Sequence, residues 1–222
     1  MKAMLLAAGR GERLRPLTES LPKPLVPVRG RPLIAWHLQA LARAGVREVV
    51  INVSWLADKL RAALGDGAAF GVQIDWSEEG PVPLETGGGI FRALPLLGPG
   101  PFLVVNADIW CDIDFATLSV PPEALAKLVL VPNPPHHPLG DFALEGDRII
   151  EGTGPRFTYS GVGVYWPEFF HDCWPGRFPL LPLLQRALAY GRLHGELHHG
   201  RWYDVGTLER LTELEAQLSG VE

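Results

Sequence analysis

Apolar and polar positions along the first half of the chain follow the pattern of strands and helices in alternation. Short apolar runs of strand length are separated by stretches in which apolar residues recur at helical spacing. The predicted strands are 5–8, 46–53, 72–76 and 101–110, and the predicted helices are 33–45 and 56–64. This order with short connections predicts an α/β fold, in which helices cover both faces of a mostly parallel sheet.

The second half of the chain has a different pattern, with more strands than helices. Residues 78–90 (EEGPVPLETGGGI) are rich in proline and glycine, so we expect a loop that leads into a short helix at 90–94. The later predicted elements are strands at 127–131, 157–166 and 201–207, a hairpin at 140–152, and helices at 179–191 and 208–218. We interpret the hairpin and its neighbours as a small accessory β region of one domain that spans residues 1–222.

A glycine-rich and arginine-rich segment follows the first predicted strand. Gly9 and Gly11 remove side chains, so that backbone N–H groups can approach a ligand closely, and three nearby arginines add fixed positive charge. Loops at the carboxyl ends of parallel strands are where open α/β sheets bind ligands. The segment therefore predicts a polyphosphate site.

Two familiar phosphate motifs do not match this segment. A P-loop needs Gly-Lys-Ser/Thr, whereas Gly11 is followed by Glu12 and Arg13. The dinucleotide fingerprint needs a small residue where Leu14 stands, and Pro16 interrupts the helix that should follow. A Walker A site is excluded and a Rossmann dehydrogenase is disfavoured.

Composition limits the ligands and the compartment. With 222 residues and 47% hydrophobic content the chain can bury a full core, while its net charge of −5 offers no basic surface for nucleic acid. Cys111 and Cys173 are too few for a disulfide framework, which suits a reducing cytoplasm. The opening apolar stretch is too short for a signal peptide, and no other segment could span a membrane. We expect a cytoplasmic monomer or small homo-oligomer.

Several polar residues are candidates for chemistry at the predicted polyphosphate site. Asp108 ends an apolar strand and Asp204 lies in WYDVGT, and one or two carboxylates with phosphate oxygens are the usual ligands of Mg²⁺. Lys23, between two prolines, could reach the phosphates as a point charge. Glu151 and the segment 159–161 could hydrogen-bond a hydroxylated substrate. The histidine pairs at 136–137 and 198–199 lack zinc-site spacing, so we interpret them as solvated or close to substrate.

The segment LLAAGRGERLRPLTESLPKPLVPV resembles the signature of the sugar-phosphate nucleotidyltransferases. The resemblance extends through VNAD at 105–108, the hairpin and WYDVGT at 202–207, and so covers essentially the whole chain. It implies a Rossmann-like nucleotidyltransferase fold, with 1–118 mainly nucleotide-binding and 119–222 mainly sugar-phosphate-binding. The expected reaction transfers a nucleotidyl group from a nucleoside triphosphate to a sugar 1-phosphate.

The resemblance also implies roles for individual residues. Arg13 and Lys23 are expected to be catalytic and to bind the phosphates, and Asp108 and Asp204 to hold Mg²⁺. The expected nucleotide-binding residues are Leu6, Ala8, Gly9, Gly11, Glu85, Thr86, Gly88 and Asn106. The expected sugar-binding residues are Glu151, Ser160 and Gly161. Many relatives have Glu-Lys-Pro where this chain has Glu-Gly-Thr at 151–153, and many have glycine in place of Glu85.

The expected substrates are UTP and N-acetylmuramic acid 1-phosphate. Within the family, PLETGGGIFRALPLLG and NPPHHPLGDF most resemble the uridylyltransferases of bacterial cell-wall recycling. A narrow base loop formed by Glu85 and the glycine triplet favours a pyrimidine, and Arg156, His136 and His137 are candidates to meet the lactyl carboxylate of the sugar. The alternatives are a mannose- or heptose-1-phosphate guanylyltransferase and a non-catalytic nucleotide-sensing module.

Overall fold

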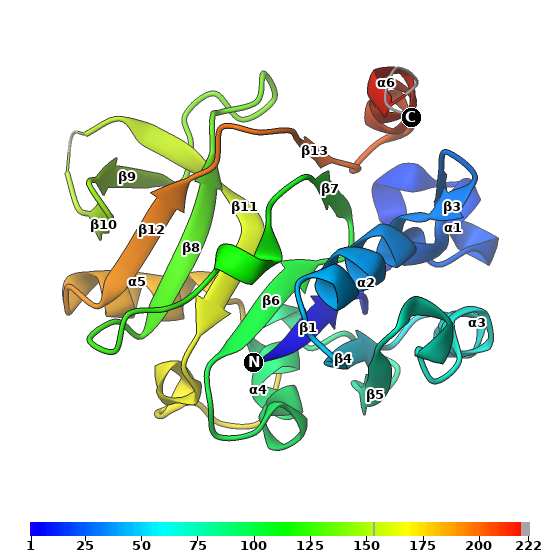
Figure 1. Ribbon diagram of the computed structural model, residues 1–222, viewed down its shortest axis with the longest axis horizontal. Coiled ribbons are helices and arrows are strands. Elements are labelled where there is room, and N and C mark those ends of the chain that lie inside the picture. The colour runs from blue at the N-terminus through cyan, green and yellow to red at the C-terminus, as the bar shows by residue number, and fades with distance from the viewer. Residues whose placement is uncertain (153, 219–222) are drawn as a thin grey trace.

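A nine-stranded mixed sheet forms the centre of the molecule, with a β-ribbon and a small hairpin beside it (Figure 1). The computed structural model describes residues 1–152 and 154–218. The sheet strands are β1 (Lys2–Leu6), β4 (Glu48–Val53), β5 (Gln73–Glu78), β6 (Phe102–Asn106), β8 (Ala126–Val131), β9 (Phe142–Glu145), β10 (Arg148–Ile150), β11 (Arg156–Tyr165) and β12 (Leu193–Leu197). The ribbon pairs β7 (Ile109–Cys111) with β13 (Trp202–Asp204), and the hairpin pairs β2 (Pro27–Val28) with β3 (Arg31–Pro32).

The strand order is β5-β4-β1-β6-β11-β8-β12-β10-β9. Strands β5, β4, β1 and β6 pair in parallel, so their carboxyl ends lie along one edge of the sheet. The antiparallel pairing of β6 with β11 then joins this half to the later strands. The helices are α1 (Leu17–Ser20), α2 (Leu33–Arg43), α3 (Ala57–Leu64), α4 (Glu85–Leu97), α5 (Leu181–Ala189) and α6 (Leu208–Leu218).

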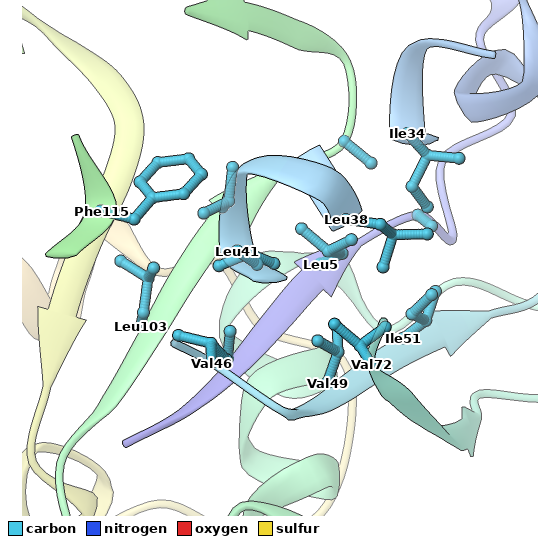
Figure 2. Packing of buried hydrophobic residues seen from close by; sticks show 14 of the residues in the cluster. Leu5, Ile34, Leu38, Leu41, Val46, Val49, Ile51, Val72, Leu103 and Phe115 are labelled. Carbon is cyan, nitrogen blue, oxygen red and sulfur yellow. The ribbon is translucent and has the colours of Figure 1, made fainter. Parts of the chain in front are cut away.

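Alternating side chains of the central strands enter two separate cores. In β1, Leu5 belongs to the core that contains residues of α2 and α3 on one face, whereas Met4 belongs to the core that contains residues of α4 and α5 on the other. Figure 2 shows Leu38 and Leu41 of α2 lying over Leu5 and Val49 of neighbouring strands. This alternation is the period of two expected for a strand covered on both faces. The predicted α/β fold is confirmed.

A third, smaller cluster attaches the C-terminal helix α6 beside β7 and β13. Leu214 of α6 is fully buried against Val28, Trp110 and Val205. These residues come from the β2–β3 hairpin, the β7–β13 ribbon and the segment after β13. The cluster therefore fixes the position of α6 relative to the ribbon.

Two predicted elements have different bounds in the structure, and one strand was missed. The helix expected at 90–94 begins at Glu85, so the glycine run 87–89 lies inside α4 rather than in a loop. The strand expected at 101–110 breaks after Asn106, because the chain turns there to pair β7 with β13 instead of continuing in the main sheet. Strand β12 was not predicted at all. The predicted hairpin forms as β9 and β10 and lies at the far edge of the main sheet.

Candidate active site

Two adjoining pockets open at the carboxyl ends of the parallel strands, the edge where open α/β sheets bind ligands. The first pocket, of about 200 Å³, is lined by Leu6, Ala7, Ala8, Gly9, Lys23, Pro24, Asn52, Glu79, Pro83, Glu85, Thr86, Asn106 and Asp108. The second pocket, of about 340 Å³, is lined by Arg13, Asn106, Asp108, Ile109, His136, His137, Thr158, Tyr159, Ser160, Gly161, Trp202 and Asp204. Because Asn106 and Asp108 line both, two ligands bound in them would meet at these residues.

The glycine loop after β1 forms one wall of the first pocket through Ala8 and Gly9. Gly11 lies beyond the lining residues and has a φ of 63°, in the left-handed region that favours glycine. A Cβ there would approach side-chain carbons of Lys23 and Thr18 to 3.0 Å. Gly11 thus shapes the turn, and its contact with a nucleotide stays a prediction.

Asn52 and Glu79, at the ends of β4 and β5, connect the glycine loop to α4. Asn52 Oδ1 accepts a hydrogen bond from the buried Ala7 N–H at 2.7 Å, and Asn52 Nδ2 donates to Glu79 Oε1 at 2.6 Å. Glu79 Oε2 in turn accepts from the Leu84 N–H at 2.7 Å. A Cβ on Gly89 would lie 2.4 Å from Glu79 Oε1, so glycine leaves room for this carboxylate. These bonds hold opposite walls of the first pocket together.

The start of α4 holds three residues expected to bind the nucleotide, of which Glu85 and Thr86 line the first pocket. Glu85 is the first residue of the helix and has a φ of 63°, a conformation that glycine adopts without strain. Its carboxylate forms an ion pair with Arg177 at 2.8 Å. Gly88 is not among the residues that line the pocket: its N–H donates to the Phe178 carbonyl, and a Cβ would lie 2.3 Å from the Gly176 carbonyl oxygen. Close backbone packing accounts for glycine there, and the contact of Gly88 with a nucleotide stays a prediction.

Strand pairing brings Asp108 and Asp204 together. Asp204 is opposite Ile109 in the β7–β13 ribbon, and the Val205 N–H donates to the Asp108 carbonyl at 3.0 Å. The two carboxylates therefore come from adjacent positions on paired chains, although they are 96 residues apart in the sequence. Both line the second pocket.

Asp108 and Asp204 each form an ion pair with a cationic side chain from a different part of the chain. Lys23 Nζ lies 2.7 Å from Asp108 Oδ2, and the Lys23 side chain is only 9% exposed. Arg210 Nη1, from α6, donates to Asp204 Oδ2. Each pair keeps two half-buried or buried charges compensated.

A buried histidine supports the turn that carries Asp108. His37 of α2 has its Nε2 2.7 Å from the Ile109 carbonyl oxygen, which can only accept, so Nε2 carries the proton. Burial lowers the pKa of His37 from 6.5 to about 4, against smaller opposing effects of this hydrogen bond and of Asp108. The ring is therefore neutral near pH 7 and acts as a fixed donor beneath the turn.

The predicted sugar-binding residues Ser160 and Gly161 both have structural roles within the protein. The Ser160 hydroxyl donates to the Val129 carbonyl at 2.6 Å and is fully buried, so its proton is already used within the sheet. Gly161 has a φ of 82°, and a Cβ there would lie 2.6 Å from Asn106 Nδ2. Both residues line the second pocket, and Gly161 leaves room for the Asn106 side chain.

Two other candidates lie away from the pockets. Glu151 is exposed just after β10 and lines neither pocket, so its contact with the sugar stays a prediction. Thr153 lies outside the described residues. Arg156 donates to the Asp141 carbonyl and does not line the second pocket. His136 and His137 do line it.

The second histidine pair has a structural contact. His198 Nε2 lies 2.8 Å from Asp112 Oδ1, and Arg201 donates to the same carboxylate through its backbone N–H and its Nε. Although burial raises the pKa of Asp112, these hydrogen bonds outweigh that effect and lower the pKa below its usual value. The three residues lock the loop before β13 onto the end of β7.

The chemistry of the donor set fits Mg²⁺. Within residues 1–152 and 154–218, no group of three or more His, Cys, Asp or Glu side chains is arranged to hold a metal. The carboxylates of Asp108 and Asp204 both line the second pocket, and Mg²⁺ commonly binds one or two carboxylates together with phosphate oxygens and water. The residues present therefore fit an ion that arrives with a phosphate ligand.

Several lining residues were missed from the sequence. Asn52 and Glu79 stand at or just after the carboxyl ends of strands, and the rule that singled out Asp108 would have found them. Trp202 donates from Nε1 to the Ser160 carbonyl at 2.8 Å, which the sequence did not indicate. Arg210 had no distinguishing signal, because arginine on a polar helix face is usually solvated.

Comparisons with known proteins agree with this architecture. The family model described as Nucleotidyl transferase matches residues 2–138. Two N-acetylmuramate alpha-1-phosphate uridylyltransferases are similar over nearly their full length. That of Neisseria meningitidis is 51% identical, covering 97% of each chain, and that of Caulobacter vibrioides is 38% identical, covering 98% of this chain and 96% of the other.

Similarity to solved structures supports the fold. A UDP-glucose pyrophosphorylase complexed with UDP-glucose superposes with a TM-score of 0.81 at 19% identity, covering 100% of this chain and 99% of the other. The family match spans more than half of the chain, the two relatives align along almost all of it, and both pockets lie where strand-end ligand sites of such a sheet are expected. On these grounds the chain is a member of the nucleotidyl transferase family.

Proposed function

We propose that the protein transfers the uridylyl group of UTP to N-acetylmuramic acid 1-phosphate and releases pyrophosphate. The observation that carries the proposal is the 51% identity to the Neisseria meningitidis N-acetylmuramate alpha-1-phosphate uridylyltransferase over 97% of both chains. The two adjoining pockets are consistent with it, since two anionic ligands have to meet. The reaction would serve reuse of cell-wall sugars in the cytoplasm. No helix in the described part of the chain is long and apolar enough to cross a membrane.

The reaction joins an oxygen of the sugar phosphate to the α-phosphorus of UTP. The bond from that phosphorus to the oxygen bridging to the β-phosphorus breaks, and pyrophosphate leaves with the electron pair. The attacking phosphate is already ionised, so positioning and charge neutralisation matter more than a general base. Mg²⁺, held by Asp108 and Asp204, would neutralise phosphate charge.

The pocket geometry supports a division of labour within the chain. The first pocket is lined only by residues up to Asp108, whereas the second also draws on residues 136–204. We infer that UTP occupies the first pocket and the sugar phosphate the second, with 1–118 mainly nucleotide-binding and 119–222 mainly sugar-phosphate-binding. Lys23, at the first pocket beside Asp108, is then placed to meet the α-phosphoryl group and the incoming phosphate. Arg13, which lines the second pocket, is assigned to charge on the leaving pyrophosphate, so the β- and γ-phosphates of UTP would extend from the first pocket towards the second.

A substrate panel tests the proposal. UTP, dTTP, GTP and ATP are each combined with the 1-phosphates of N-acetylmuramate, N-acetylglucosamine, glucose and mannose, and pyrophosphate release is measured. We expect UTP with N-acetylmuramic acid 1-phosphate to give the highest kcat/KM. Preference for GTP with mannose 1-phosphate would overturn the proposal in favour of a guanylyltransferase, and no turnover with any pair would favour a nucleotide-sensing module.

A further inference from the structure

Arg210 is held in place by the packing of α6. It lies in the first turn of this helix, where its N–H lies 3.3 Å from Thr207 Oγ1. Leu214, one helical turn farther on, is fully buried in the cluster that anchors α6 beside the β7–β13 ribbon. The Arg210 side chain is 19% exposed. A largely buried guanidinium on an anchored helix is preorganised, so a ligand would bind it without ordering a mobile side chain.

The guanidinium of Arg210 faces the same space as two residues of the second pocket. Its Nη1 donates to Asp204 Oδ2 and lies 3.3 Å from His136 Nε2. A Cβ built on Gly206 would lie 3.0 Å from both Arg210 Nη1 and Arg13 Nη2, so glycine there leaves room between two guanidinium groups. Within the described part of the chain, the side-chain hydrogen bonds of Arg210 use Nη1, which leaves Nε and Nη2 for a second planar acceptor.

Arg210 also borders a third pocket, of about 510 Å³, that adjoins the second. The two share His136, Trp202 and Asp204. Of the described residues that line the third pocket, Arg210 alone carries a permanent positive charge, whereas Asp204, Glu209 and Glu213 are acidic. Within this described lining, an anion entering from the second pocket would find its one fixed cation at Arg210, whose Nη1 is already bound to Asp204, and it would be repelled from Glu209 and Glu213.

We propose that Arg210, with His136, is the receptor for a carboxylate on the sugar of the acceptor, and that it selects acidic sugar 1-phosphates. This inference rests on the proposed function. N-acetylmuramic acid 1-phosphate differs from N-acetylglucosamine 1-phosphate by a lactyl ether that carries a carboxylate. A guanidinium binds a carboxylate through two parallel hydrogen bonds, which gives geometric selectivity as well as attraction. Arg156, the arginine expected for this role from the sequence, does not line the second or third pocket.

The test compares the two sugars in three proteins. The wild type, Arg210→Gln and Arg192→Gln are assayed with UTP and each of the two N-acetylated sugar 1-phosphates. Arg192 is a matched control, because it also forms an arginine–carboxylate pair, with Glu168 at 3.1 Å, and lines none of the three pockets. We expect Arg210→Gln to lower kcat/KM for N-acetylmuramic acid 1-phosphate about thirtyfold or more, as when one partner of a desolvated charge pair is truncated. The loss for N-acetylglucosamine 1-phosphate should be much smaller, because this sugar has no carboxylate for Arg210 to bind, and the loss that both sugars share measures the effect of breaking the pair with Asp204.

Other outcomes overturn the inference. Equal losses for both sugars would show that Arg210 acts only through Asp204, and an unchanged ratio would remove it from sugar selection. Calorimetric binding of N-acetylmuramic acid 1-phosphate to each protein provides a readout independent of turnover. If Arg210→Gln fails to fold by circular dichroism, His136→Gln takes its place and is expected to shift the same ratio.

The same assay separates this inference from the proposed function. If the wild type prefers N-acetylmuramic acid 1-phosphate and Arg210→Gln keeps that preference, only the inference about Arg210 fails. If the wild type prefers a neutral sugar, or neither turns over nor binds N-acetylmuramic acid 1-phosphate, the proposed function fails, and the inference with it.

Discussion

Replacing His37 by glutamine should make the free energy of unfolding fall less steeply as the pH is lowered. His37 is 2% exposed, and burial lowers its pKa from 6.5 to about 4. Between these pH values the unfolded chain binds a proton that the folded protein does not bind. A group whose folded-state pKa is depressed contributes stability above the unfolded value, and that contribution is lost as the pH falls.

The size of the effect follows from the shift. At 1.36 kcal/mol per pKa unit, a fall from 6.5 to about 4 corresponds to about 3 kcal/mol when the pH has dropped below both values. By the same linkage, the free energy of unfolding falls by about 1.4 kcal/mol at pH 5.5 and by about 2.6 kcal/mol at pH 4.5, relative to neutral pH. Glutamine cannot titrate, and its amide N–H can still donate to the Ile109 carbonyl.

Urea unfolding of the wild type and His37→Gln at pH 7.5, 5.5 and 4.5 measures this contribution. Because carboxylates also titrate over this range, the informative quantity is the difference between the two proteins at each pH. We expect the free energy of unfolding of the wild type to fall more steeply, so that the difference changes by about 2.5 kcal/mol between pH 7.5 and 4.5. Parallel curves would refute the reasoning, since they would show that His37 does not resist protonation.

Four further substitutions test the site and its supports. Asn52→Ala should lower the free energy of unfolding by about 3 kcal/mol in urea titrations, since a buried backbone N–H and a buried carboxylate lose a partner. Gly88→Ala should cost about 2 kcal/mol in the same assay, because its Cβ would lie 2.3 Å from a backbone carbonyl oxygen. Asp108→Asn should raise the Mg²⁺ concentration for half-maximal pyrophosphate release more than about tenfold with an unchanged circular dichroism spectrum; near-normal Mg²⁺ dependence would exclude it as a ligand. Arg13→Ala should lower kcat about a hundredfold or more, and a defect confined to KM would indicate uniform binding instead.

The sequence predicted the elements whose periodicity is local. The strands β4, β5 and β8 and the helices α2, α3 and α6 have apolar residues at the spacing their structure requires. The hairpin turn at Gly146 was predictable because glycine adopts its φ of 60° without strain. The start of α4 was not, because glycine disfavours a helix by propensity and only packing against the segment at Gly176 shows why the glycines are there.

Part of the site was predictable from one rule, that polar residues at the carboxyl ends of parallel strands line the ligand site. That rule singles out Asp108, and it would have extended to Asn52. The meeting of Asp108 with Asp204 depends on the β7–β13 pairing, which has no local pattern because each strand has only three residues. The sequence offered both aspartates as candidate Mg²⁺ ligands, and the family resemblance then implied that they act together.

The two predicted metal ligands, Asp108 and Asp204, each have a cationic partner that the sequence pattern did not indicate. Asp108 and Asp204 are close because of the ribbon, but each is compensated by a cation from a different element, Lys23 near the glycine loop and Arg210 on α6. A half-buried carboxylate pair would otherwise lose hydration and repel, at a cost that packing would have to offset. Lys23 and Arg210 are 187 residues apart in the sequence, so no window of sequence contains both. The pairing of these carboxylates with cations is therefore a property of the folded chain, and it requires both the N-terminal loop and the C-terminal helix.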